Sequence, residues 1–212
     1  MTAATLQDAR SNLVRERVLD GVLEVLAAGD DLTFARVARA AGVPERTIYR
    51  HFPSKEALHA AIWAWANERM GFTGPFPTDE TGYVALVRTA HPGFERLAPV
   101  IRELLASKDG LSVRLTANDQ RRRNALAAVN TEAPGLDAVA ARRVAAALQL
   151  LTAAATWQTL HDYWDMDGEE AGETAALAIE LLLAGARARA ETAPATTADR
   201  GPADDPAAPS SI

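Results

Sequence analysis

The stretch "LTFARVARAAGVPERTIYRHFPSKEAL", residues 32–58, decides the fold of the N-terminal part of this chain. Thr33 is a suitable N-cap for a short helix that ends at Gly42, where a C-terminal glycine would lie. Pro44 is acceptable in the first turn of a second short helix, which ends before the next proline. Ser54 can cap a longer helix, "KEALHAAIWAWANERM". Two short helices around a glycine turn predict a helix-turn-helix.

The same stretch divides into an apolar and a polar face. The apolar residues form a predicted buried seam: Phe34, Val37, Ala38, Val43, Ile48 and Phe52. The second short helix then exposes Glu45, Arg46, Thr47, Tyr49 and Arg50. An exposed polar face on the second helix of a helix-turn-helix is suited to the major groove of DNA.

Lys55 supplies an independent indication of a DNA contact. It lies in the first turn of the helix capped by Ser54, where the positive end of the helix dipole disfavours a cation. A DNA phosphate there would accept hydrogen bonds from the free backbone N–H groups and from the Lys55 ammonium. Residues 33–56 contain five Lys or Arg and only two Glu, although the whole chain has a net charge of −6. The sequence therefore predicts a small basic face on an acidic molecule.

Helical spacing of apolar residues continues through most of the chain. The predicted helices cover residues 15–29 and, beyond the long fourth helix, 83–90, 98–107, 118–129, 136–164 and 169–190. The segment between residues 71 and 82 is broken by Gly and Pro, and we expect Pro92, Pro99, Gly110 and Pro134-Gly135 to separate the later helices. The chain is predicted to be all-α.

The quoted stretch resembles the N-terminal domain of the TetR family of bacterial transcriptional regulators. The turn glycine, the Thr-x-Tyr-x-His-Phe string and the Lys-Glu-Ala-Leu helix start carry the resemblance, which covers roughly residues 12–62. Residues 156–183, "TWQTLHDYWDMDGEEAGETAALAIELLL", also resemble the last two helices of many members. The resemblance implies an all-helical homodimer that binds a double-stranded DNA operator, with a small-molecule effector enclosed by the C-terminal domain.

Roles for individual residues follow from this resemblance. Thr33, Tyr49, His51 and Lys55 match positions that usually contact phosphates, while Glu45, Arg46 and Thr47 match positions that face bases; Arg50 completes the predicted DNA-binding set. We expect Arg46 to make a bidentate guanine contact. Pro44 departs from the Ser or Thr of many members, so a phosphate contact or a cap is expected to be missing there.

The expected organisation has four parts. Residues 1–11 form a flexible N-terminal arm, and residues 12–56 form a three-helix DNA-binding domain. The fourth helix joins that domain to residues 57–190, a helical ligand-binding and dimerisation domain. Residues 191–212 are poor in large apolar residues and rich in Pro, Ala and Thr, which predicts disorder.

Two further sets of residues are expected in the C-terminal domain. The helices "VAAALQLLTAAATW" and "AALAIELLLAGA" are apolar around nearly their whole circumference, which predicts a four-helix dimer interface. Its expected members are Leu148, Leu151, Thr152, Ala155, Ile179, Leu182 and Leu183. A mainly apolar effector is expected to contact Trp63, Asn67, Phe72, Phe76, Tyr83, Leu86, Arg88, Leu104, Trp157 and His161.

Other classes of function have weaker support. In "HDYWDMDGEE", residues 161–170, aligning Gly168 with the glycine of an EF-hand leaves Tyr163 and Thr174 at ligand positions, so a helix cap by Asp167 is preferred to a calcium site. We expect Arg121, Arg122 and Arg123 to face solvent. No catalytic pattern, metal or cofactor is indicated. The alternatives are a DNA-binding regulator or architectural protein without a small-molecule effector, and a helical enzyme. With no cysteine and no apolar run of membrane-spanning length, a cytoplasmic protein is expected.

Overall fold

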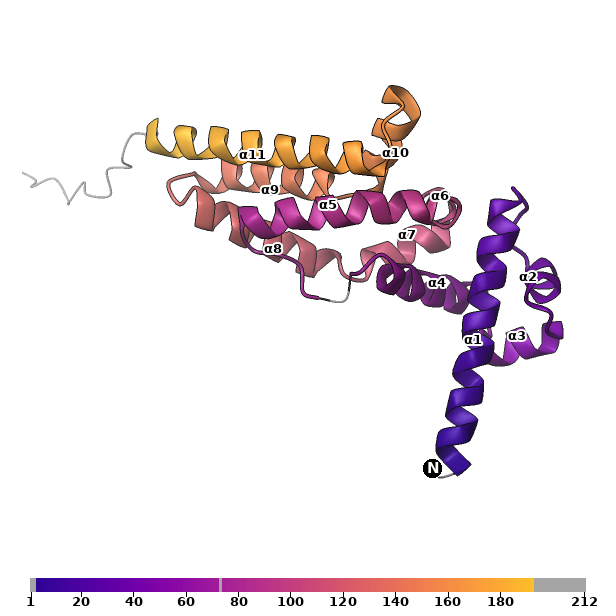
Figure 1. The fold of residues 1–212 in the computed structure, drawn as a ribbon. Coiled ribbons are helices and arrows are strands. Elements are labelled where there is room, and N and C mark those ends of the chain that lie inside the picture. Colours follow the sequence, from indigo (N-terminus) through magenta and orange to yellow (C-terminus); the bar gives the residue numbers. More distant parts are fainter. Residues whose placement is uncertain (1–2, 73, 193–212) are drawn as a thin grey trace, which may run out of the picture.

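The computed structural model describes residues 3–72 and 74–192, which fold entirely into helices and connecting turns (Figure 1). The helices are α1 (Ala3–Ala27), α2 (Phe34–Ala41), α3 (Glu45–His51), α4 (Lys55–Arg69), α5 (Glu80–Arg96), α6 (Ala98–Ala106), α7 (Lys108–Leu115), α8 (Asn118–Glu132), α9 (Ala138–Leu151), α10 (Ala154–Trp164) and α11 (Gly168–Thr192). In Figure 1, α1–α3 stand at one end and α4 leads from them into a bundle of α5–α11. The predicted all-α fold is confirmed.

The ends of the short N-terminal helices are fixed by local hydrogen bonds. Thr33 Oγ1 accepts the backbone N–H of Arg36 at 3.3 Å and caps α2. Gly42 closes α2 with a φ of 63°, a left-handed conformation that glycine adopts without strain. Ser54 Oγ accepts the backbone N–H of Ala57 at 3.2 Å and caps α4. Pro44 occupies the N-cap of α3 rather than its first turn, and makes no side-chain cap.

Two hydrophobic cores hold the helices together. The first core joins α1–α4 to the end of α5, to α6 and to parts of α7 and α10, and buries Ile48, Ile62 and Ile101 almost completely. The second core lies among α5, α8, α9 and α11 and buries Leu148 and Ile179. The first core therefore contains side chains of α3, α4 and α6, and it is shared by the helix-turn-helix and the bundle.

The start of α11 lies very close to α5. A Cβ atom added to Gly168 would lie 2.7 Å from the Cα of Pro92, and one added to Gly172 would lie 3.2 Å from the carbonyl oxygen of Val87. Asp167 Oδ1 accepts the backbone N–H of the third following residue at 2.9 Å, so the predicted cap of this helix is confirmed. Close helix packing, rather than a calcium loop, accounts for the glycine at residue 168.

Several local expectations were wrong. Residues 3–11, expected as a flexible arm, form the first turns of α1. Pro92 lies inside α5 instead of ending a helix, and Gly110 lies inside α7. The expected tail begins at residue 191, but residues 191–192 end α11 and the rest of the tail lies outside the described residues.

Within residues 3–72 and 74–192, no single helix is long and apolar enough to cross a membrane. The pair α9 and α10 reaches that length and composition together, but is bent by 62°.

Candidate nucleic-acid interface and ligand cavity

The outer face of α3 carries the residues predicted to read DNA. Ile48 is fully buried beneath the helix, whereas Glu45, Arg46 and Arg50 are exposed and Thr47 is half-buried. The Tyr49 side chain is 48% exposed, and its ring centroid lies 4.5 Å from that of Phe34 on α2. This contact between rings restricts Tyr49 while leaving it accessible.

The end of α3 is tied to α1 by an arginine that the sequence analysis missed. Arg15 Nη1 donates to the carbonyl oxygen of His51 at 3.4 Å, and its guanidinium lies 4.8 Å from the ring centroid of Phe52. Burial, and then the charges of Arg50 and Arg15, lower the pKa of His51. Its buried Nε2 atom has no hydrogen-bond partner among the described residues. The periodicity of a long helix gave no signal that Arg15 faces α3.

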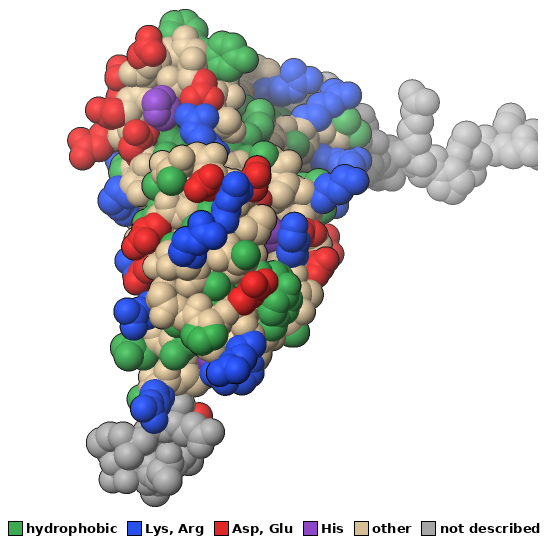
Figure 2. Space-filling model, turned by 90° about the vertical axis from the view of Figure 1, so that its right-hand side faces the viewer, with side chains coloured by type: hydrophobic (Ala, Val, Ile, Leu, Met, Phe, Trp, Pro, Cys, Tyr) green, Lys and Arg blue, Asp and Glu red, His purple; other side chains and the backbone are tan. Residues whose placement is uncertain are grey.

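Lys55 and Thr33 lie at the starts of α4 and α2, and both are exposed. The helix N-termini therefore face solvent near the outer face of α3, as an anion contact requires. Figure 2 views this end of the molecule: Lys and Arg side chains are spread over the lower part of the face, while the densest group of Asp and Glu lies at the top left. Lys and Arg side chains also lie at the upper right of this view, so the basic residues are not confined to the end that carries α3.

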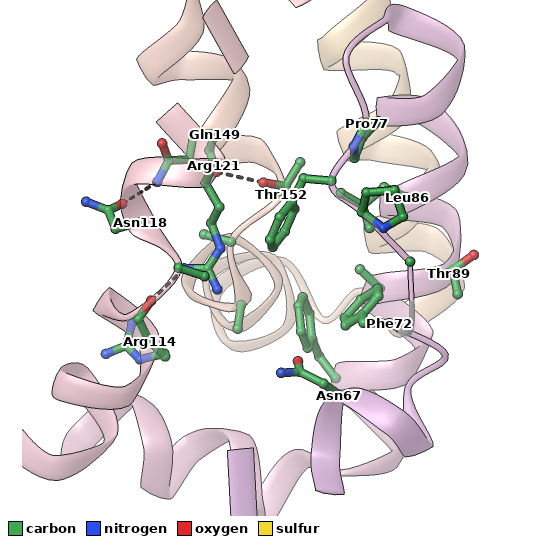
Figure 3. Close-up of a pocket in the computed structure, with 18 of the residues that line it drawn as sticks. Asn67, Phe72, Pro77, Leu86, Thr89, Arg114, Asn118, Arg121, Gln149 and Thr152 are labelled. Carbon is green, nitrogen blue, oxygen red and sulfur yellow. Dashed lines mark hydrogen bonds between the residues drawn. The ribbon is translucent and has the colours of Figure 1, made fainter. Parts of the chain in front are cut away.

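A cavity of about 660 Å³ lies where α4 meets the bundle (Figure 3). Its walls come from α4, residues 71–72 and 74–77, α5, α7, the start of α8, the end of α9 and the turn that leads to α10. Five of the ten predicted effector residues line it: Trp63, Asn67, Phe72, Phe76 and Leu86. The Gly- and Pro-broken segment is therefore part of the cavity wall, because it does not pack as a continuous helix.

The other five predicted effector residues lie elsewhere. Leu104 is buried in the first core and Tyr83 in the second, where burial raises the tyrosine pKa to about 12. Arg88 is exposed on α5 and pairs with Glu173 at 2.8 Å. Trp157 is fully buried and donates from Nε1 to Glu95 at 3.0 Å. His161 packs edge-on against Trp157, at 5.7 Å between ring centroids. Hydrophobicity alone could not separate core residues from cavity residues.

The sequence analysis also missed most of the polar cavity wall. Arg114, Asn118, Arg121 and Gln149 all line the cavity. Gln149 Nε2 donates to Asn118 Oδ1 at 3.0 Å. Arg121 was expected to face solvent with its two neighbours; instead it turns inward and is half-buried, whereas Arg122 and Arg123 are exposed. Figure 3 shows Arg121 and Arg114 on the wall opposite Phe72 and Leu86.

The predicted dimer residues fall into three groups. Leu148, Ile179 and Leu183 are fully buried within the single chain, so their assignment to a subunit interface was wrong. Thr152 lines the cavity, while Leu151 and Leu182 are half-buried and Ala155 is exposed. The exposed apolar side chains of α11 are Leu177 and Leu181, at 56% and 65% exposure. Leu148, Ile179 and Leu183 are therefore core residues of the single chain, and an interface that includes α9 and α11 stays a prediction.

Among the residues that the structure describes, no group of three or more His, Cys, Asp or Glu side chains could hold a metal ion.

Comparisons with known proteins agree with this geometry. Residues 25–62 match the family model described as bacterial regulatory proteins, tetR family. A nucleoid occlusion factor, SlmA, from Marinobacter nauticus is 39% identical over 56 residues, which span 26% of this chain and 29% of that relative. NalD, described as the secondary repressor of the MexAB-OprM multidrug efflux pump in Pseudomonas aeruginosa, has a similar fold, with a TM-score of 0.56 and 16% identity. That similarity covers 81% of this chain and 96% of NalD. The segment that matches the tetR family model coincides with the helix-turn-helix, and the fold is similar to that of NalD over most of this chain.

Proposed function

We propose that this protein is a transcriptional repressor that binds a near-palindromic DNA operator as a homodimer and is released by a small molecule. The observation that carries the DNA-binding part is the outer face of α3, whose polar side chains are exposed while Ile48 anchors the helix in the first core. A rigidly seated helix with a polar outer face can enter the major groove without rearrangement. Residues 12–56 would act as the DNA-binding domain and residues 57–190 as the effector and dimerisation domain.

Separate residues would supply affinity and specificity. Arg46, exposed on the first turn of α3, would contact a guanine edge, with Glu45 and Thr47 near neighbouring bases. Phosphate contacts would come from Thr33, Tyr49, Arg50, His51 and Lys55. Lys55 and the free N–H groups at the start of α4 would bind the same phosphate. Pro44 makes no cap and has no N–H, so α3 begins without such a contact.

The exposed face of α11 supports the dimer. Leu177 and Leu181 are four residues apart and therefore lie on the same side of the helix. Further apolar side chains remain accessible nearby in the chain: Leu182 on α11 and Leu151 on α9 are half-buried, and Ala155 on α10 is exposed. An interface of about 800 Å² per subunit would cover such a face and place two copies of α3 on one side of a two-fold axis.

The position of the cavity supports release by a ligand. Trp63 and Asn67 line it from α4, the helix that begins at Lys55. A ligand that binds better to the conformation with widely spaced α3 helices would shift α4 and move the two reading helices out of register. A change from 1:99 to 99:1 between the two conformations requires a difference in ligand binding of about 5.5 kcal/mol.

The test combines operator selection with a release assay. Random duplexes selected on the purified protein should yield a near-palindrome bound by one dimer, and a ligand found by thermal shift should weaken that complex. Binding without sequence preference, with no ligand effect, would instead indicate an architectural DNA-binding protein. Sharp operator recognition that no stabilising ligand alters would remove only the release step.

A further inference from the structure

Arg121 places a positive charge inside the cavity. Its Nη1 donates to the carbonyl oxygen of Arg114 at 2.6 Å. The guanidinium lies 5.1 Å from the ring centroid of Phe76 and 5.8 Å from that of Trp63. The side chain is thus held at one defined position between aromatic rings, with further N–H groups available to a ligand.

Arg114 adds a second cation to the same wall. Its Nε donates to the carbonyl oxygens of Leu104 and Gly110, at 3.2 and 3.3 Å, which leaves the terminal nitrogens for other partners. Burial lowers the pKa of Arg114, and burial together with the charge of Arg114 lowers the pKa of Arg121. Within the described part of the chain, no carboxylate oxygen lies within 4.0 Å of either guanidinium.

The C-terminal end of α7 compensates part of the positive charge of Arg121. The carbonyl of Arg114 belongs to the last turn of α7, and a cation at a helix C-terminus is favoured by the helix dipole. That hydrogen bond uses one of the five donors of Arg121, and a dipole end carries only about half an elementary charge. Two half-buried guanidinium groups beside a mostly apolar cavity therefore still lack a full counter-charge.

The opposite wall is mainly apolar, although Thr89 also lies on that side. Phe72 and Leu86 face the arginines across the cavity (Figure 3), and the ring of Phe72 lies 6.1 Å from that of Phe94. A molecule spanning the cavity would meet cations at one end and hydrocarbon at the other. The volume of about 660 Å³ lies within the range of sites for drug-sized ligands.

We propose that the cavity binds an amphipathic organic acid, whose carboxylate pairs with Arg121 beside Arg114 and whose apolar body lies against Phe72 and Leu86. The inference specifies the effector class of the proposed repressor and rests on the assignment of this cavity as the effector site. Charge complementarity favours it, because a protein with a net charge of −6 repels organic acids except where local cations gather. It also replaces the expected mainly apolar ligand with a charged one.

The first test compares matched ligands on the full-length protein by isothermal titration calorimetry. The probes are naphthalene-2-carboxylate and octanoate, each paired with its uncharged primary amide. At least one acid should bind about tenfold more tightly than its amide, because a charge-assisted pair with arginine is lost in the amide. Added salt should reduce the ratio of acid affinity to amide affinity, because it screens the charge interaction. If neither acid binds more tightly than its amide, the proposal is wrong.

Matched variants locate the charge. Arg121→Gln should lower acid affinity about tenfold and leave amide affinity unchanged, and Arg121→Lys should retain part of the preference. Arg122→Gln removes the charge of an exposed neighbouring residue and should change neither the affinity for the acid nor the affinity for the amide. Equal losses in Arg121→Gln and Arg122→Gln would contradict the assignment to the cavity. If Arg121→Gln fails to fold, the wild-type preference and the Arg121→Lys variant still decide the question.

Operator release is measured separately. Acids that bind through Arg121 without changing operator affinity would leave this inference intact and remove the release step of the proposed function. Release by uncharged compounds, unaffected in Arg121→Gln, would support the release step and overturn the inference.

Discussion

The imidazole Nε2 of His91 lies 3.2 Å from the carbonyl oxygen of Leu151, and the His91 side chain is fully buried. The carbonyl can only accept, so Nε2 carries the proton and donates it. The buried Nδ1 has no partner among the described residues, which makes the neutral ring the stable form. Through this bond α5 holds the end of α9, immediately before the cavity residue Thr152.

The first prediction concerns acid sensitivity. Burial lowers the pKa of His91 to about 4, whereas an unfolded histidine has a pKa of about 6.5. Between these values the unfolded chain binds a proton that the native chain does not, so the free energy of unfolding falls as pH falls. Across the whole interval the loss is about 3 kcal/mol. Urea unfolding at several pH values between 7 and 4 measures it.

The His91→Gln variant isolates that contribution from the titration of carboxylates. Its unfolding free energy should fall less between pH 7 and pH 4 than that of the wild type. His161→Gln, at a less buried histidine, serves as the control for the substitution itself. Identical slopes for the wild type and His91→Gln would show that His91 does not resist protonation in the native protein.

The second prediction separates base reading from phosphate contact. Arg46→Ala should cost about 1 to 3 kcal/mol of operator binding and relax the preference at one base position. Lys55→Ala should weaken binding to all sequences similarly and reduce the salt slope by about one charge. Fluorescence anisotropy with an operator and its single-base variants, over a range of salt, measures both. Equal losses of discrimination in the two variants would contradict the division of roles.

The third prediction concerns the dimer. Leu181→Glu places a charge on the exposed apolar face of α11 and should shift sedimentation at micromolar concentration from dimer to monomer. The matched control is Leu13→Glu, at an equally exposed leucine (71%) on α1, which should remain dimeric. Both variants should keep the helical circular-dichroism signal. A wild-type monomer, or a dimer that tolerates Leu181→Glu, would place the interface elsewhere.

The fourth prediction concerns the packing of α1 against α2 in the helix-turn-helix part. A Cβ atom on Gly21 of α1 would lie 2.9 Å from the backbone nitrogen of Ala41 at the end of α2. Gly21→Ala should therefore destabilise the protein by about 1 to 3 kcal/mol, although alanine favours helices by about 1 kcal/mol over glycine. Thermal unfolding measures the net change in stability from the steric clash and the gain in helix propensity. A more stable Gly21→Ala variant would mean that α1 and α2 can separate at little cost.

Local signals in the sequence located the helix-turn-helix well. Thr33, Gly42 and Ser54 act through hydrogen bonds or dihedral angles within three residues, so their roles could be predicted without the tertiary fold. The cavity was harder to predict. Trp63 and Trp157 have similar sequence surroundings, and only the packing of distant helices places one in the cavity and the other in the core.

Arg121 shows the same limit for charged residues. It lies in the first turn of α8 beside Arg122 and Arg123, and that sequence pattern favours solvent exposure for all three. Only the position of α7, whose terminal carbonyl accepts the Arg121 hydrogen bond, turns this side chain inward. The interface prediction for Leu148 on α9 and Leu183 on α11 was wrong for a related reason. A helix that is apolar on all sides does not reveal which side faces its own domain.

The last prediction uses the two tryptophans to separate ligand binding from folding. Trp157 is fully buried and its Nε1 donates to Glu95, so Trp157→Ala should lower the free energy of unfolding by about 3 to 5 kcal/mol. Trp63 is only half-buried and lines the cavity, so Trp63→Ala should cost less stability but lower the affinity of any cavity ligand by at least about fivefold. Chemical unfolding and calorimetric titration of each variant give the two quantities. A Trp157→Ala variant that folds normally but loses ligand binding, beside a Trp63→Ala variant that retains it, would move the ligand site away from this cavity and toward α10.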